Sequence, residues 1–117
     1  MRVVEAVGRP ETGILVDTLH FDRSGSRLEQ LDAIPASRLP MVHVADAPVQ
    51  ASYTTEELLH TARSERLPPG EGGIDIRAII RRMPPGIPVA LEVPMPGAVP
   101  EAAALRVRQA AERVLAG

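Results

Sequence analysis

Short aliphatic runs bounded by turn residues predict three β-strands, at residues 13–17, 41–46 and 88–93. Near-continuous apolar runs are typical of parallel strands, because helices cover both faces of such a sheet. One face of these strands is wholly aliphatic and is expected to pack beneath helices. It comprises Ile14, Val16, Val42, Val44, Val89, Leu91 and Val93.

Helical patterns lie between and after the strands, at residues 26–34, 54–63, 75–82 and 100–115. Thr54 and Asp75 are good N-caps, and Pro100 is favoured in a first turn. The last segment carries an apolar stripe of Ala104, Leu105, Val107, Ala111, Val114 and Leu115. The alternation predicts three successive right-handed βα units in an α/β domain. A closed (β/α)8 barrel needs about 250 residues, so 117 residues are too few.

The other strand face carries one ionisable residue towards the carboxyl end of each strand: Asp17, His43 and Glu92. Side chains alternate between faces along a strand, and functional residues of parallel sheets gather at the carboxyl edge. Two carboxylates and an imidazole suit Mn²⁺, Mg²⁺, Co²⁺ or Zn²⁺. The alternative is structural: a hydrogen-bonded core histidine and two carboxylates that cap loops.

The amino-acid composition excludes several kinds of catalysis and several kinds of partner. The chain has no Cys, which excludes thiolate catalysis, and all 13 basic residues are Arg, which excludes Schiff-base chemistry. A net charge of -2 and only two aromatic residues, Phe21 and Tyr53, argue against a nucleic-acid partner. No apolar run reaches the roughly 18 residues of a membrane span and no signal peptide is evident. We therefore expect a cytoplasmic protein without a membrane partner.

Four segments resemble motifs of the sugar phosphate isomerase/epimerase superfamily, the xylose isomerase-like TIM barrels. Residues 13–21 resemble its Asp-x-x-His strand end, and residues 42–46 resemble its next strand. Residues 66–75 are similar to its Arg…Pro-Gly-Glu-Gly…Asp loop, and residues 90–94 to its last strand. The resemblance implies a partial (β/α)8 barrel: about three C-terminal βα units that form a single domain over residues 1–117.

In that family, four successive strands supply Glu, Asp, His and Glu to a divalent ion. The resemblance implies Asp17, His43 and Glu92 as metal ligands, with Mn, Mg, Co or Zn as the ion. It implies His20 and Arg66 as residues that bind a sugar or sugar-phosphate substrate, and Glu92 with His20 as catalytic residues. The implied reaction is aldose–ketose isomerisation or epimerisation, by proton transfer beside a carbonyl.

The resemblance leaves the family's first Glu ligand and first five strands without a counterpart, and Met1 would fall inside the preceding helix. We therefore expect the isolated chain to self-associate or to need a complementary N-terminal chain. The alternative function is a truncated, non-catalytic interaction module. Hydrolysis at abasic DNA sites, another chemistry of the superfamily, needs more His and acidic ligands than this sequence offers.

Several remaining features have simpler interpretations. Residues 70–73 are expected to form a turn rather than a phosphate cradle. Asp46 is expected either to orient His43 or Arg66 or to cap its strand. His60 is expected on the surface, and Asp22 with Arg23 as a solvated loop pair.

Overall fold

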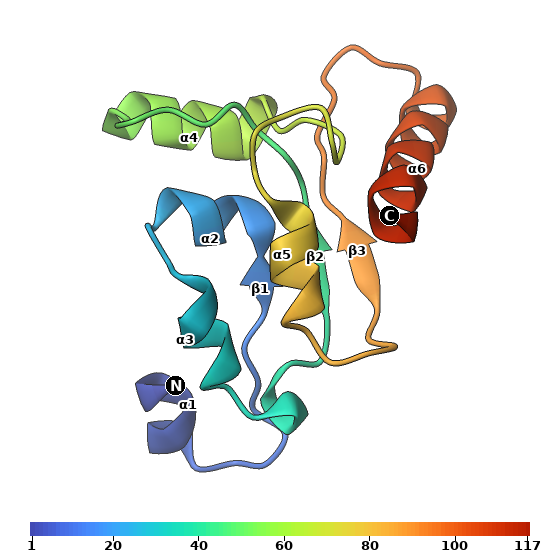
Figure 1. The fold of residues 1–117 in the computed structure, drawn as a ribbon. Coiled ribbons are helices and arrows are strands. Elements are labelled where there is room, and N and C mark those ends of the chain that lie inside the picture. The colour runs from blue at the N-terminus through green and yellow to red at the C-terminus, as the bar shows by residue number, and fades with distance from the viewer.

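A parallel three-stranded sheet flanked by helices forms the centre of the chain (Figure 1). The computed structural model describes residues 1–117. The strands β1 (Val16–Asp17), β2 (Val42–Val44) and β3 (Val89–Leu91) lie in the order β1-β2-β3. Helices lie in each connection between successive strands, as the sequence predicted. The strands are shorter than predicted, because only these residues pair in the ladder.

The helices are α1 (Arg2–Val7), α2 (Thr18–Arg23), α3 (Leu28–Asp32), α4 (Thr55–Ser64), α5 (Ile76–Arg81) and α6 (Pro100–Ala116), with a 3₁₀ turn η1 at Ala36–Arg38. The four predicted helices are present as α3 to α6, although α3 is shorter than expected. Helix α1 lies where the resemblance placed the helix before the first strand, whereas α2 was not predicted. Helix α2 follows β1 directly because Asp17 is its N-cap, where the carboxylate accepts a hydrogen bond from the His20 backbone N–H.

The hydrophobic core lies between one sheet face and the helices packed against it. Its buried residues are Val16, Leu19, Leu31, Leu39, Val42, Val44, Ala47, Ile74, Ile76, Ile79 and Met83. The predicted aliphatic face of β1 and β2 is therefore confirmed at Val16, Val42 and Val44. None of the helices is both long and apolar enough to cross a bilayer.

The predicted burial of β3 and of the α6 stripe is wrong in part. Val89 and Leu91 are each 37% exposed, because β3 is an edge strand that α6 covers incompletely. Helix α6 is buried through Val107, Ala110 and Ala111. Three members of its predicted stripe are exposed instead: Ala104, Leu105 and Leu115.

Asp46 anchors the segment that precedes α5. Its buried carboxylate accepts hydrogen bonds from the backbone N–H groups of Ala47, Gly70 and Ile74, at 2.8, 2.9 and 3.0 Å. Its backbone also exchanges two 2.8 Å hydrogen bonds with Leu67. The carboxylate thus caps backbone groups, and it makes no hydrogen bond to any predicted site residue.

The predicted turn at residues 70–73 is confirmed, and two glycines explain its shape. Gly70 has a φ of +86°, which a residue with a side chain rarely adopts. A Cβ on Gly72 would lie 2.5 Å from the Ala47 carbonyl oxygen and would also meet the Asp46 carboxylate. The close approach of this turn to Asp46 therefore requires glycine at position 72.

The prediction that Asp22 and Arg23 form a solvated pair is wrong. The Arg23 side chain is buried over the Tyr53 ring, with its guanidinium carbon 4.1 Å from the ring centre. Arg23 donates hydrogen bonds to the Tyr53 hydroxyl, the Pro48 carbonyl and Asp22. These contacts tie α2 to the loop after β2. His60, by contrast, is exposed as predicted, and it pairs with Glu65.

Candidate metal and substrate site

Strand register brings Asp17, His43 and Glu92 together at the carboxyl edge of the sheet. Asp17 pairs with His43 across β1 and β2, and His43 pairs with Ala90 across β2 and β3. Glu92 lies two residues beyond Ala90, on the same face. One potential ligand atom from each of the three side chains lies within 4.8 Å of the others. The predicted convergence of these side chains is therefore present in the structure.

The His43 imidazole contacts Glu92 directly. Nδ1 of His43 lies 2.7 Å from a Glu92 carboxylate oxygen, which is within hydrogen-bond distance. The Glu92 backbone N–H donates to the Val44 carbonyl at 3.1 Å, which extends the ladder by one bond beyond β3. This bond fixes the backbone of Glu92, while its side chain remains 50% exposed.

Arg66 joins the cluster from the segment after α4. Its Nη1 donates to Asp17 at 2.8 Å and lies 3.7 Å from the Glu92 carboxylate. Its Nη2 lies 3.4 Å from Nε2 of His20. The five side chains assigned to the site by sequence therefore form one connected group, although they come from four separate segments.

The donor set fits a divalent metal ion. Two ligands that each lie about 2.2 Å from one ion are at most about 4.4 Å apart. The potential ligand atoms of Asp17, His43 and Glu92 lie within 4.8 Å of one another, so small side-chain rotations would allow all three to bind the same ion. An imidazole nitrogen with two carboxylate oxygens is a set that Mn²⁺, Co²⁺ and Zn²⁺ all accept.

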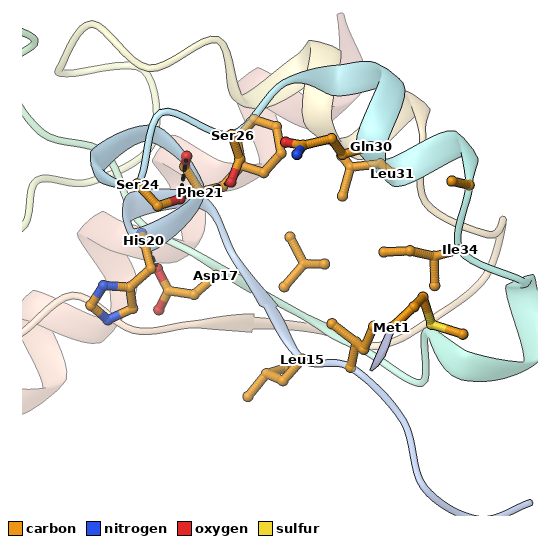
Figure 2. A pocket seen from close by; sticks show the side chains of 13 residues that line it. Met1, Leu15, Asp17, His20, Phe21, Ser24, Ser26, Gln30, Leu31 and Ile34 are labelled. Carbon is orange, nitrogen blue, oxygen red and sulfur yellow. Dashed lines mark hydrogen bonds between the residues drawn. The ribbon is translucent and has the colours of Figure 1, made fainter. Parts of the chain in front are cut away.

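A groove of about 630 Å³ runs along the free side of β1 (Figure 2). Asp17 and His20 lie at one end, and the apolar side chains of Leu15, Ile34 and Met1 lie towards the other. Leu15 is 50% exposed in this groove. Of the five cluster residues, Asp17 and His20 thus line this apolar groove, whereas His43, Arg66 and Glu92 do not.

Sequence reasoning missed Thr18, which holds the turn between β1 and α2 against β2. Its buried hydroxyl donates to the Ala45 carbonyl at 2.6 Å and accepts from the Ala45 backbone N–H at 3.0 Å. These two bonds fix the end of β1 beside the end of β2, where Asp17 and His43 lie. The Thr after a strand-end Asp was the only local signal, and it does not reveal a partner 27 residues away.

Comparison with known proteins identifies the fold family. The model of the xylose isomerase-like TIM barrel family matches residues 1–114. This chain belongs to that family. Its three parallel strands and intervening helices are part of a (β/α)8 barrel, as the partial-barrel prediction stated.

The curated relatives of this family member are named inosose isomerases. The protein from Bacillus velezensis is 31% identical over 77 residues, which are 65% of this chain and 25% of the relative. The protein from Halalkalibacterium halodurans is 31% identical over 75 residues, which are 63% of this chain and 24% of the relative. The xylose isomerase-like chain thus spans about a quarter of the length of these relatives.

This chain also matches only part of each related solved structure. A crystal structure of the IolI protein with a bound zinc atom has a TM-score of 0.77 and 23% identity, over 97% of this chain and 41% of the other. A xylose isomerase domain protein from Alicyclobacillus acidocaldarius has a TM-score of 0.70 and 30% identity, over 96% of this chain and 40% of the other. This xylose isomerase-like chain therefore corresponds to about two-fifths of such a barrel.

Proposed function

We propose that this chain carries three ligands of a divalent metal site in a sugar isomerase or epimerase of the xylose isomerase-like family. The observation that supports this most strongly is the convergence of Asp17, His43 and Glu92, whose potential ligand atoms lie within 4.8 Å of one another. The bound zinc of the IolI structure belongs to a protein of the same fold. A bound divalent ion would act as a Lewis acid that polarises a substrate carbonyl.

The other side chains of the cluster suit proton transfer beside that carbonyl. Glu92 is half exposed, so its carboxylate can take a proton from the carbon next to the carbonyl and return it to the adjacent carbon of the enediolate. Epimerisation would require a second base on the opposite side of that carbon. Arg66 and His20, 3.4 Å apart, would hydrogen-bond the substrate oxygens on which negative charge develops.

The names of the relatives and the residues of the site support one substrate class. Proteins named inosose isomerases share about 31% identity with this chain over their matched segments. A polyhydroxy ketone such as inosose offers a carbonyl with a neighbouring hydroxyl, and these are oxygens that Arg66 and His20 would hydrogen-bond. We therefore propose a sugar-like polyhydroxy ketone as the substrate.

A complementary polypeptide would complete the barrel. The outer side of β1 presents Leu15 and the apolar groove, and the outer side of β3 presents Val89 and Leu91. Unpaired strand edges with apolar neighbours favour pairing with further strands. We propose that the partner supplies the remaining barrel strands and a fourth carboxylate ligand, as the resemblance implies.

Reconstitution tests this proposal. The part of the Bacillus velezensis inosose isomerase that lies outside the matched segment is mixed with this chain, Mn²⁺ and inosose, and isomer formation is measured. We expect turnover only in the mixture, and loss of that turnover with Glu92→Gln. Co-sedimentation without turnover would contradict a catalytic role and favour an interaction module. Failure to associate would contradict the completion of a barrel.

A further inference from the structure

A positive charge already lies between the two carboxylates of the proposed metal site. The guanidinium of Arg66 is 2.8 Å from Asp17 and 3.7 Å from Glu92, and its side chain is only 6% exposed. Asp17 is also largely buried, with 10% of its side chain exposed. Arg66 therefore neutralises part of a cluster of acidic groups that would otherwise repel one another.

Arg66 is held in this position from the side opposite the carboxylates. Its Nε donates to the Ala62 carbonyl at 3.0 Å, in the last turn of α4. Its backbone neighbour Leu67 is fixed by two hydrogen bonds to Asp46. A guanidinium that left this position would give up bonds at both ends and leave buried N–H groups without acceptors.

We propose that Arg66 is a built-in counter-ion that competes with the divalent metal ion for Asp17 and Glu92. This inference rests on the proposed metal site. An ion bound by both carboxylates would lie close to the fixed positive charge of Arg66. It would also occupy the Asp17 carboxylate, which is the acceptor in the shortest ion pair of Arg66. Arg66 therefore weakens metal binding, and it keeps the carboxylates in place when the ion is absent.

A role for Arg66 in positioning Asp17 alone would predict the opposite effect on metal affinity. If Arg66 only held Asp17 in a geometry suited to the ion, its removal would weaken metal binding. Asp17 keeps a second anchor, because its other oxygen accepts from the His20 backbone N–H at 3.1 Å. The carboxylate thus remains oriented without Arg66, and removal of the competing charge dominates.

Calorimetric titration with Mn²⁺ tests the inference on the full chain. We expect Arg66→Gln to bind Mn²⁺ about tenfold more tightly than the unaltered chain, equivalent to about 1.4 kcal/mol. Arg66→Lys retains the charge and should stay close to the unaltered chain. Arg23→Gln is the matched control, because Arg23 is equally buried but pairs with Asp22 and with none of the proposed metal ligands. It should leave the affinity unchanged.

Equal or weaker binding by Arg66→Gln would overturn the inference. An Asp17→Asn variant separates this failure from that of the proposed function, because Mn²⁺ binding that persists in Asp17→Asn would overturn the metal site itself. A second measurement does not depend on the folding of a variant. Saturation of the unaltered chain with Zn²⁺ should shift the Nε–H NMR signal of Arg66 and leave that of Arg23 in place. An unmoved Arg66 signal would contradict the competition.

Discussion

Asp46→Ala should destabilise the chain far more than its single carboxylate suggests. The substitution removes the acceptor for three backbone N–H groups, those of Ala47, Gly70 and Ile74. The bonds to Ala47 and Ile74 are buried, and the bond to Gly70 is partly buried. All three N–H groups lose a charged acceptor that water cannot easily replace.

The magnitude follows from the number and burial of these bonds. A buried donor left without a partner costs about 1–3 kcal/mol. Two fully buried donors therefore give a loss of about 2–6 kcal/mol, and the partly buried donor adds a smaller amount. This is a large part of the roughly 5–15 kcal/mol by which a domain is stable. Asp46→Asn retains one oxygen acceptor and should lose about half as much.

Urea unfolding followed by circular dichroism measures the loss by linear extrapolation. Asp32→Ala is the matched control, because Asp32 is an exposed carboxylate that pairs with Arg82 at the surface. That change should cost less than about 1 kcal/mol. A free energy of unfolding for Asp46→Ala within 1 kcal/mol of the control would refute the role assigned to the buried carboxylate.

Two further predictions concern packing and association. Gly72→Ala places a Cβ 2.5 Å from the Ala47 carbonyl oxygen and should lower the free energy of unfolding by about 2–3 kcal/mol in the same assay. Gly25→Ala has open space around it and should cost only about 1 kcal/mol, because Gly25 has a left-handed backbone. Equal losses in the two variants would contradict the close contact at Gly72. In sedimentation velocity the chain should self-associate with rising concentration, and Leu15→Lys with Val89→Lys should reduce this; the same sedimentation for both proteins would contradict association through the strand edges.

Strand parity made the convergence of the three candidate ligands predictable from the sequence. Asp17, His43 and Glu92 share one parity near the carboxyl ends of their aliphatic runs, and parallel strands in register place such residues on the same face. The prediction needed no contact information, because alternation along a strand and pairing between strands fix which side chains share a face. The helices were predictable for a similar reason, since Thr54, Asp75 and Pro100 mark their starts locally.

Contacts between distant segments were not predictable from local patterns. Arg23 is an ordinary charged residue in the sequence, and its burial depends on Tyr53, which lies 30 residues later. The capping role of Asp46 depends on Gly70 and Ile74, whose backbone N–H groups reach its carboxylate only in the folded chain. The exposure of Val89 depends on how far α6 covers an edge strand, which an apolar pattern alone does not report.

Metal binding by the isolated chain tests the central claim most directly. Mn²⁺ or Co²⁺ is titrated by calorimetry into the unaltered chain, His43→Ala and His60→Ala. His60 is the matched control, because it also pairs with a glutamate at 2.7 Å but lies on an exposed helix. We predict binding by the unaltered chain that is weaker than at a complete four-ligand site, the same binding by His60→Ala, and a loss of at least about tenfold in His43→Ala. Identical titrations of the unaltered chain and His43→Ala would contradict the metal site.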